Sequence, residues 1–380
     1  MSKKKILVIM GRYLPGYKDG GPVQSIKNLV DFLGDEYEFM ILTNDRDHGD
    51  KNPYPNICIN SWNEVGKARV YYLPPKGFTF KVIKEVSKNV DLIYVCGCFD
   101  LYAIKTLCMK KLGIIKNPLI IAAMGLFSPM EFRLKYYKKK TFTTLFNVLG
   151  MFDGIYWSAT SLMEMEEISQ QIRVNNNIFI AEDVPRKVDD YKIIKEKEEN
   201  KLNIVWISRI SPKKNLKGAI EILKKVNSEI NFTIYGPIHD ADYWEQCQLE
   251  ITQLPNNIKC IYKGSIQSEN VVKELQKHHV FLFPTLGENY GHVIQEALSA
   301  GCPCILSDQT PWIDLEVNDI GASYSLQNES QFISLIHRYS KMDKKEFNII
   351  VEKTIKYVVS KSNFDSDKNG YKKMFGEVLH

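Results

Sequence analysis

The sequence of 380 residues contains no apolar run long enough to cross a bilayer. Its longest nearly uninterrupted apolar stretch, residues 118–127, spans about ten residues, whereas a transmembrane helix needs roughly 18 to 20. After Lys5, only five apolar residues precede Gly11, too few for the hydrophobic segment of a signal peptide. We therefore expect a cytoplasmic protein without a transmembrane helix.

The eight cysteines include no C-x2-C pair of the kind that zinc sites use. The two close pairs have C-x-C spacing, so we expect reduced and mostly buried thiols. The sequence also lacks helix-turn-helix, zinc-finger and aromatic RNA-binding signatures, and a net charge of +5 is weak for this length. No nucleic-acid partner is expected.

The composition is that of an ordinary globular protein, with 44% hydrophobic, 25% charged and 11% aromatic residues. At about 150 residues per domain, the length fits two domains or one large barrel. Residues 1–185 hold 24 Lys and Arg against 19 Asp and Glu, whereas residues 186–380 hold 26 of each kind. The whole excess of positive charge lies in the first half, where we expect an anionic partner.

Apolar, β-rich runs alternate with helix-length amphipathic stretches, which is the pattern of parallel sheets covered by helices. In the first half, the pattern predicts strands at 5–10, 37–43, 69–73, 91–96, 119–123 and 154–158, and helices near 22–34, 99–112 and 161–171. In the second half, it predicts strands at 203–207, 231–235, 258–262, 280–283 and 303–306, helices at 215–226, 269–277 and 291–300, and a helical tail from about 325 to 379.

Residues 186–201 carry 11 charged side chains in 16 positions and have no regular apolar face, which marks a domain boundary. We expect an N-terminal Rossmann-like domain over 1–185, a charged linker over 186–201, and a C-terminal Rossmann-like domain over 202–362. A final helix over 363–380 is expected to pack back on the first domain. Two such α/β/α domains facing one another make a deep cleft, and ligands bind at the carboxyl ends of their strands.

The strongest local pattern follows the predicted strand at 280–283. A loop after this strand carries Glu288, and Glu296 lies eight residues later, about one and a half turns into a helix. Two carboxylates so placed can accept hydrogen bonds from two sets of sugar hydroxyls. Three residues open the helix, and its free N-terminal amides can hold a diphosphate: Asn289, Tyr290 and Gly291.

This segment resembles the E-x7-E stretch of the retaining nucleotide-sugar glycosyltransferases of family 4, the group 1 glycosyltransferases, which have the GT-B fold. Glu288 and Glu296 match both acids, and the context Gly-Glu-Asn-Tyr-Gly-His and Ala-Leu-x-Ala-Gly-x-Pro sets the match apart from a chance E-x7-E. The resemblance covers about residues 1–375 and is strongest over 203–324. It implies that a sugar moves from a nucleoside diphosphate to an acceptor hydroxyl with retention, and that the C-terminal domain holds the donor.

A second match is the basic loop after the predicted strand at 203–207. Cations at the carboxyl end of a strand are placed to neutralise a leaving diphosphate. In the family, an Arg and a Lys five residues apart bind the donor's phosphates, and Arg209 and Lys214 have this spacing. Lys213 is an alternative to Lys214, and solvated basic side chains are the plain alternative.

The first strand-to-helix turn contains Gly20 and Gly21 before Pro22. Such a turn permits close approach of a phosphate or sugar to a helix N-terminus. The turn lacks G-x-G-x-x-G spacing, which argues against a dinucleotide oxidoreductase. Family members carry a comparable glycine loop near donor and acceptor, and the alternative is a plain turn.

The chain also departs from the family. Many relatives have a His after the fourth strand and a basic residue before the Gly of a later loop, whereas these stretches read Val95–Cys98 and Ala123–Leu126 here, with Gly125 as the candidate glycine. No catalytic His is identifiable in the N-terminal domain. Ser161 and Glu164 fit the family and also form a capping box; for Glu164 we favour capping alone.

Three other features each allow two interpretations. His292, in the first helical turn, either touches the donor or packs the helix start. The triplets Asp45-Arg-Asp47 and Asp240-Ala-Asp242 invite a metal site, but we expect polar loops and no metal. A basic cluster suits anionic lipid headgroups, or is a solvated helix face: Lys138, Lys139 and Lys140.

The expected function is that of a retaining, metal-independent glycosyltransferase without a cofactor, with a UDP- or GDP-sugar as donor. Glu288 would hold the donor sugar, Glu296 the ribose, and Arg209 and Lys214 the diphosphate. The acceptor would be a glycan or polyprenyl-linked glycan of a bacterial surface polysaccharide, such as O-antigen, capsule or exopolysaccharide, with peripheral contact to the cytoplasmic face of the membrane. Two rivals are a non-catalytic nucleotide-sugar-binding subunit and a GT-B epimerase that acts without an acceptor.

Overall fold

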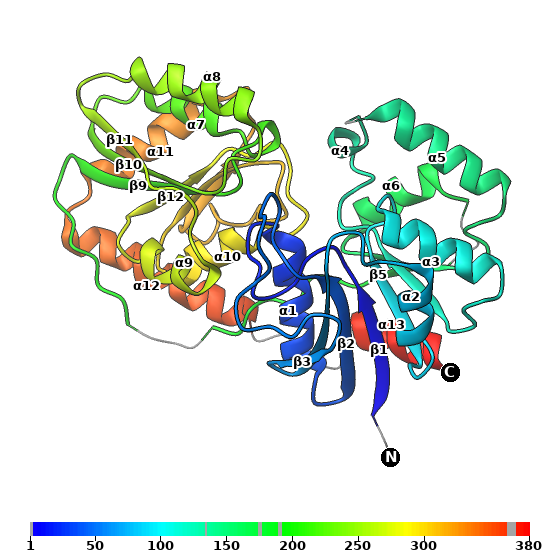
Figure 1. Ribbon diagram of the computed structural model, residues 1–380. Helices are drawn as coiled ribbons and strands as arrows, with labels where there is room; N and C mark the ends of the chain where they lie inside the picture. The colour runs from blue at the N-terminus through cyan, green and yellow to red at the C-terminus, as the bar shows by residue number, and fades with distance from the viewer. Residues whose placement is uncertain (1–2, 134, 174–176, 189–191, 363–369) are drawn as a thin grey trace. The chain divides into compact units, whose positions relative to one another are not determined.

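The computed structural model describes residues 3–133, 135–173, 177–188, 192–362 and 370–380. The chain divides into two units, one formed by Met1–Val184 with Phe364–His380 and one formed by Pro185–Asn363. Each unit is a mostly parallel sheet with helices on both faces (Figure 1). The predicted fold class, a two-domain α/β protein with parallel sheets, is confirmed.

The first unit contains an eight-stranded sheet in the order β3-β4-β2-β1-β5-β6-β7-β8. Strand β3 pairs with β4 in the antiparallel sense, and the other neighbouring strands pair in parallel. The elements of this unit are β1 (Lys4–Ile9), α1 (Gly21–Leu33), β2 (Tyr37–Asn44), β3 (Trp62–Val65), β4 (Ala68–Leu73), α2 (Phe80–Val86), β5 (Leu92–Cys96), α3 (Leu101–Lys111), β6 (Leu119–Ala122), α4 (Pro129–Arg133), α5 (Tyr136–Val148), β7 (Tyr156–Ala159), α6 (Leu162–Gln171), β8 (Ile178–Ile180) and α13 (Gly370–Leu379).

Strand β1 shows why this sheet is covered on both faces. Its side chains alternate between two hydrophobic cores, with Ile6 and Val8 in one core and Leu7 and Ile9 in the other. Helices α1 and α13 close the first core, and α2, α3, α5 and α6 close the second. A continuous apolar strand is therefore buried from both sides, as in other parallel sheets.

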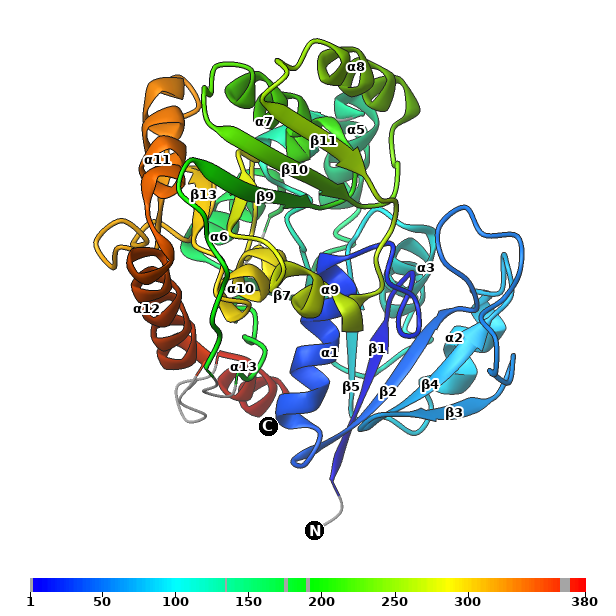
Figure 2. The ribbon, with the colours of Figure 1, turned by 90° about the vertical axis from the view of Figure 1, so that its left-hand side faces the viewer.

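The second unit contains a six-stranded parallel sheet in the order β11-β10-β9-β12-β13-β14. Helices α7, α8 and α11 lie on one face and α9, α10 and α12 on the other (Figures 1 and 2). The elements are β9 (Lys201–Ile207), the 3-10 turn η1 (Pro212–Lys214), α7 (Leu216–Leu223), β10 (Glu229–Tyr235), α8 (Ala241–Thr252), β11 (Ile258–Tyr262), α9 (Ser268–Leu275), β12 (Val280–Phe283), α10 (His292–Ser299), β13 (Cys304–Ser307), β14 (Gly321–Tyr324), α11 (Glu329–Lys341) and α12 (Lys344–Ser362).

Each predicted strand has a counterpart in the structure whose bounds differ by at most two residues, and the strands at 258–262 and 280–283 have the predicted bounds. Several elements were not expected, namely β3, β8, β14, α2, α4 and α8. The three unexpected strands have only three or four residues, and β3 contains polar residues at two positions, so none shows a long apolar run. Short strands of this kind are stabilised by their neighbours in the sheet rather than by their own sequence pattern.

The segment expected to be a charged linker, residues 186–201, forms part of the second unit. Two of its lysines are buried, with Lys195 donating to the thiol of Cys302 at 3.0 Å and Lys197 donating to the carbonyl of Ser340 at 2.8 Å. Burial lowers the pKa of Lys197 to about 8. Charge density alone did not distinguish these side chains from solvated ones.

The C-terminal helix α13 belongs to the first unit. Phe375 packs edge-on against Tyr37, with 5.5 Å between ring centroids, and Lys372 forms an ion pair with Glu36 at 2.6 Å. A side chain at Gly370 would meet the carbonyl oxygen of Ile180, so this glycine allows the helix to start against β8. The last residues of the chain thus help to cover one face of the first sheet.

In each sheet, chain order reverses next to the first strand of the unit. Strand β1 lies between β2 and β5, and β9 lies between β10 and β12. In open parallel sheets, ligands bind beyond the carboxyl ends of the strands at this switch point. The fold therefore points to the loops after β9 and β12 in the second unit, and to those after β1 and β5 in the first.

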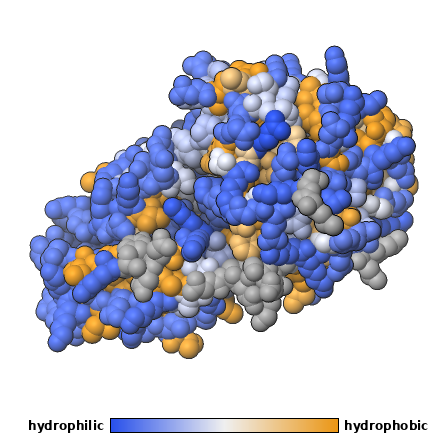
Figure 3. All heavy atoms as spheres, turned by 90° about the horizontal axis from the view of Figure 1, so that it is seen from below, coloured by the Kyte–Doolittle hydropathy of each residue, from blue (hydrophilic) through white to orange (hydrophobic). Residues whose placement is uncertain are grey.

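No helix within the described ranges is long and apolar enough to span a membrane. The eight cysteines carry free thiols, of which only Cys58 is exposed. On the face shown in Figure 3, apolar residues form separate areas between hydrophilic ones. Scattered exposed apolar side chains are normal for a folded protein.

A buried carboxyl group lies at the end of the first unit. Asp183 is only 7% exposed, and its side chain forms a hydrogen bond with Ser25 on α1. Burial raises the pKa of the Asp183 carboxyl to about 6, because the charged form has lost most of its hydration. The folded state therefore binds this proton more tightly than the unfolded state does.

We predict that Asp183→Asn stabilises the protein at neutral pH. The penalty of the charged form is absent below about pH 4, grows as pH rises to about 6 and is constant above, where it amounts to roughly 2–3 kcal/mol. Denaturant unfolding at pH 4.5 and 7.5 measures it: the variant should gain stability over wild type at the higher pH. The exposed neighbour change Glu182→Gln is the control. An equal difference at both pH values would contradict the assignment.

Candidate functional site

The carboxyl ends of β9 and β12 lie side by side, because these strands pair in parallel. Two loops therefore meet there, residues 208–215 and residues 284–291. Asn215 joins them: its side-chain amide donates to the carbonyl of Pro284 at 2.7 Å. The Asn215 oxygen accepts from the amide of Gly218 at 3.2 Å, which caps α7.

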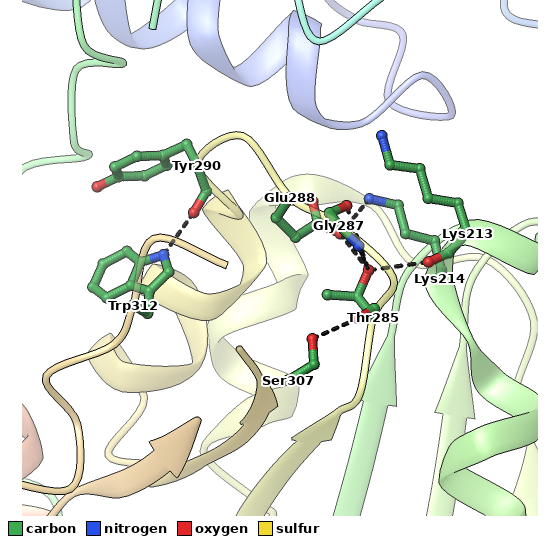
Figure 4. Close-up of polar contacts among 8 residues, drawn as sticks. All are labelled: Lys213, Lys214, Thr285, Gly287, Glu288, Tyr290, Ser307 and Trp312. Carbon is green, nitrogen blue, oxygen red and sulfur yellow. Dashed lines mark hydrogen bonds and ion pairs between the residues drawn. The ribbon is translucent and has the colours of Figure 1, made fainter. Parts of the chain in front are cut away.

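Lys214 and Glu288 form an ion pair where these loops meet (Figure 4). The Lys214 Nζ to Glu288 Oε1 distance is 2.5 Å, and the two side chains are only 12% and 11% exposed. The hydroxyl of Thr285 donates to the same carboxylate oxygen at 3.1 Å. The structure therefore brings together two residues that the sequence analysis selected independently, from different motifs.

The charges around Lys214 are unbalanced. Burial lowers the pKa of Lys214, Glu288 acts in the opposite direction, and the neighbouring charges of Arg209 and Lys213 lower the pKa further. The Lys214 ammonium thus has one carboxylate partner and two cationic neighbours among the charges that act on its pKa. Such a group suits a doubly charged anion such as a diphosphate.

Lys213 has a different position from Lys214 in the same turn. Its carbonyl oxygen accepts a hydrogen bond from the amide of Leu286 at 2.8 Å and lies 3.1 Å from the hydroxyl oxygen of Thr285. These contacts join the turn η1 to the loop after β12, while Lys214 makes the ion pair (Figure 4). Of the two candidate lysines, the structure pairs Lys214 with Glu288.

Arg209 follows the end of β9 and is held through its neighbours. The amide of Ser208 donates to the carbonyl of Tyr235 at 3.2 Å, and that of Ile210 donates to the carbonyl of Pro237 at 2.9 Å. Gly236 lies between these two acceptors with φ of 142°, and a side chain there would come within 1.7 Å of the Ser208 carbonyl oxygen. Only glycine allows this approach, which fixes the loop that carries Arg209.

The loop after β12 ends at α10. Gly291 precedes the helix with φ of 80°, a left-handed conformation that glycine adopts without strain, and no side chain caps the helix. The first-turn amides are therefore not satisfied by an N-cap side chain, as in helices whose N-termini bind phosphate. Asn289 and Tyr290 lie in the turn directly before it.

His292 and Glu296 lie four residues apart on α10 and so share one face of the helix. His292 is 8% exposed, and burial lowers its pKa to about 4, although the charge of Glu288 acts in the opposite direction. The ring of His292 lies 4.8 Å from that of Tyr290. The imidazole is therefore neutral at physiological pH, and Glu296, half-buried, lies one turn further along.

The other predicted site residues belong to the first unit. Gly20 has φ of 64° and precedes α1, and Gly21 is the first residue of that helix; a side chain at either position would meet no atom within 4 Å. The backbone there is open, as the glycine-loop hypothesis requires. The switch point also includes Tyr102, whose hydroxyl donates to the carbonyl of Cys96 at 2.7 Å.

A hydrogen bond joins the Gly125 amide to the Glu164 carboxylate. Ser161 accepts a hydrogen bond from the Glu164 amide at 3.1 Å, which confirms the predicted cap of α6. Glu164 also has a second structural role, because its buried carboxylate accepts from the amide of Gly125 at 2.5 Å and from the amide of Thr160 at 2.7 Å. Glu164 thereby ties the loop after β6 to the start of α6.

The three lysines of the basic cluster lie on α5 and are not equivalent. Lys138 is exposed, Lys139 donates to the carbonyl of Glu131 and lies 5.3 Å from the ring centroid of Phe99, and Lys140 donates to Gln171 at 3.2 Å. Lys139 therefore has a structural role in addition to its charge.

Carboxylates of both D-x-D triplets make local contacts within the fold. Asp45 is paired with Arg46 at 2.7 Å, and Asp47 accepts from the amide of Tyr17 at 3.0 Å. Asp240 caps α8 by accepting from the amide of Tyr243 at 2.9 Å. Within the described ranges, no group of three or more His, Cys, Asp or Glu side chains could hold a metal ion.

Sequence reasoning missed the residues that support the site. Thr285 and Asn215 act through side-chain hydrogen bonds and Gly236 through a close approach, and no spacing rule identifies them. Trp312 was also missed: its indole N–H donates to the carbonyl of Tyr290 at 2.6 Å (Figure 4). The only available signals were the Pro-Thr after β12 and the Gly that follows β10.

Comparison with known proteins places this geometry in context. Residues 187–350 match the family model described as glycosyl transferases group 1. Among curated proteins, the sulfoquinovosyl transferase SQD2 of Arabidopsis thaliana is 27% identical over 108 residues, which cover 28% of this chain and 20% of that protein. The match to this relative thus spans about a fifth of its length.

Solved structures match the chain over nearly its whole length. HepE of Anabaena, in complex with UDP and glucose, has a TM-score of 0.65 at 14% identity and covers 99% of this chain and 98% of its own. WaaG, a glycosyltransferase involved in lipopolysaccharide biosynthesis, has a TM-score of 0.64 at 10% identity and covers 97% of this chain and 98% of its own. The chain therefore has the GT-B fold, and residues 187–350 of its second unit are similar to the group 1 glycosyl transferases.

Proposed function

We propose that the protein is a retaining glycosyltransferase that moves a sugar from a nucleoside diphosphate, UDP or GDP, to a hydroxyl of a glycan or lipid-linked glycan. The observation that carries this proposal is the Lys214–Glu288 ion pair beside Arg209, at the carboxyl ends of β9 and β12. It lies within the residues that match the group 1 model. HepE, whose structure contains UDP and glucose, supports a UDP-sugar as donor.

The proposed mechanism begins with the ion pair. When a donor binds, its diphosphate competes with Glu288 for Lys214, since both are anions that the same ammonium can contact. Lys214 and Arg209 then stabilise charge on the departing diphosphate, and Glu288 is released to accept hydrogen bonds from the donor sugar. Glu296, one turn into α10, holds the ribose.

The amides before and at the start of α10 add fixed dipoles aimed at the same charge. These belong to Asn289, Tyr290 and Gly291, and His292 adds a neutral imidazole nearby. Catalysis on this account depends on positioning and electrostatics, with the leaving phosphate assisting front-face attack by the acceptor hydroxyl. No divalent metal is required, because the cations of the loop after β9 take its place.

The acceptor is proposed to bind the first unit, which carries the whole excess of positive charge. Gly20 and Gly21 offer open backbone at the start of α1, and a phosphate or sugar of the acceptor fits there. A role in bacterial surface polysaccharide synthesis draws support from the similarity to WaaG, which is involved in lipopolysaccharide biosynthesis.

A membrane-facing surface is proposed on α5. Its outward side chains include Tyr137, Val148 and the following Leu149, which are 84%, 71% and 53% exposed. Lys138, which is also exposed, is the residue after Tyr137. Exposed aromatic and aliphatic side chains beside a lysine suit the headgroup region of an anionic bilayer, where an acceptor with a lipid anchor would be presented.

We predict that the wild-type protein slowly hydrolyses one member of a panel of UDP-, GDP- and ADP-sugars. Release of nucleoside diphosphate measures this reaction, and addition of EDTA should leave the rate unchanged. Lys214→Met and Glu288→Gln should each lower kcat about 100- to 1000-fold, in the range found for a lost transition-state hydrogen bond. Lys263→Met, an exposed lysine after β11, is the control.

Other outcomes would contradict this proposal in different ways. Binding of a donor without release or transfer, even with glycan acceptors, would favour the non-catalytic subunit. Conversion of the donor to an isomeric nucleotide sugar would favour the epimerase. A rate abolished by EDTA and restored by Mg²⁺ would contradict the metal-independent mechanism.

We predict that α5 mediates binding to anionic vesicles. Tyr137→Ser combined with Val148→Ser should lower the partition coefficient about tenfold in a sedimentation assay at low salt. Leu249→Ser, which removes a 64% exposed apolar side chain from α8, should leave it unchanged. Equal sedimentation of both variants with the wild type would refute this surface.

A further inference from the structure

The end of β13 and the segment after it hold the loop before α10 at three points. The Ser307 hydroxyl donates to the carbonyl of Thr285, and the amide of Glu288 donates to the carbonyl of Gln309 at 3.0 Å. The indole N–H of Trp312 donates to the carbonyl of Tyr290 at 2.6 Å (Figure 4). The third bond lies nearest to the helix.

Trp312 is itself held firmly. Its ring is 7% exposed and lies between Tyr290 and Tyr357, with centroid distances of 5.5 and 6.5 Å. Its carbonyl accepts a hydrogen bond from Ser323 in β14 at 2.6 Å. Tyr357, on α12, donates to Asp314 at 2.6 Å. The indole is therefore fixed from the sheet and from α12 before it contacts Tyr290.

The bond to Tyr290 acts at the point where the loop turns into α10. Tyr290 is one residue before Gly291, whose left-handed conformation allows this loop to turn into α10. The Tyr290 carbonyl points to the indole in Figure 4. When this carbonyl is fixed, the peptide plane that carries the next amide, that of Gly291, is fixed as well, because carbonyl and amide share one rigid plane.

We propose that Trp312 is the positioning residue of the donor site: it orients the amides at the start of α10 toward the diphosphate without touching the ligand. This inference rests on the proposed function, because it names the ligand of those amides. The hydrogen bond, rather than the bulk of the indole, carries the effect. Removal of the N–H while an aromatic ring is kept should therefore loosen the loop.

Trp206 provides a matched control for this test. It is a fully buried tryptophan in β9 of the same unit, and its indole nitrogen has no hydrogen-bond partner among the described residues. Trp206→Phe and Trp312→Phe therefore make the same chemical change, but only the second removes a hydrogen bond. Both variants lose packing, so a loss of stability alone does not separate them.

Two measurements separate positioning from packing. In hydrogen exchange of the ligand-free protein, peptides covering residues 286–294 should exchange faster in Trp312→Phe than in Trp206→Phe. In titrations with UDP and GDP, Trp312→Phe should bind the better nucleotide about tenfold more weakly than Trp206→Phe does, whereas the affinity for the free nucleoside should fall equally in both.

The outcomes distinguish this inference from the proposed function. Equal exchange of residues 286–294 in the two variants, or equal affinities for the nucleoside diphosphate, would overturn the role of Trp312 alone. A wild-type protein that binds no nucleoside diphosphate would instead overturn the proposed function, and with it the ligand assigned to these amides.

Discussion

The site depends on the pairing of β9 with β12. Lys214 and Glu288 are separated by 74 positions in the sequence, and they meet because both follow strands that end at the same edge of one sheet. The crossover through β10 and β11 runs to one side of β9, and the chain then returns to the other side. This reversal leaves the two loops adjacent, so the topology itself brings a cation and a carboxylate together.

The charges at this edge of the sheet explain why many contacts hold the loops after β9 and β12 in place. Arg209 and Lys213 act on Lys214 with the same sign, and burial also opposes its charged form. Glu288 offsets only part of this cost. Hydrogen bonds from Thr285 and Asn215, the close approach at Gly236 and the indole of Trp312 keep the groups in place. A preorganised group of cations is suited to a ligand that brings two negative charges.

The sequence predicted the parts of the fold and site that depend on local pattern. The central strands are long apolar runs, and Glu288, Arg209 and Lys214 stand in motifs with fixed spacing, so their positions were predictable. The contacts of Glu164 were predicted only in part. The cap at the start of α6 follows from the local sequence, whereas the hydrogen bond between Glu164 and Gly125 joins residues 39 positions apart. Lys195 lies in a segment that looked solvated and is buried, because charge density does not reveal which carbonyl groups lie nearby. Trp312 could not be predicted, because its role is one hydrogen bond between loops of neighbouring strands.

The most direct measurement of the central claim is calorimetric titration of the free nucleoside diphosphate into wild type, Lys214→Met and Glu288→Gln. If Glu288 competes with the diphosphate for Lys214, Glu288→Gln should bind the nucleotide as tightly as wild type or more tightly, while Lys214→Met should bind it at least tenfold more weakly. If both variants lose affinity to the same extent, or if neither does, the ion pair is a structural feature of the loops and the account of the donor site is contradicted.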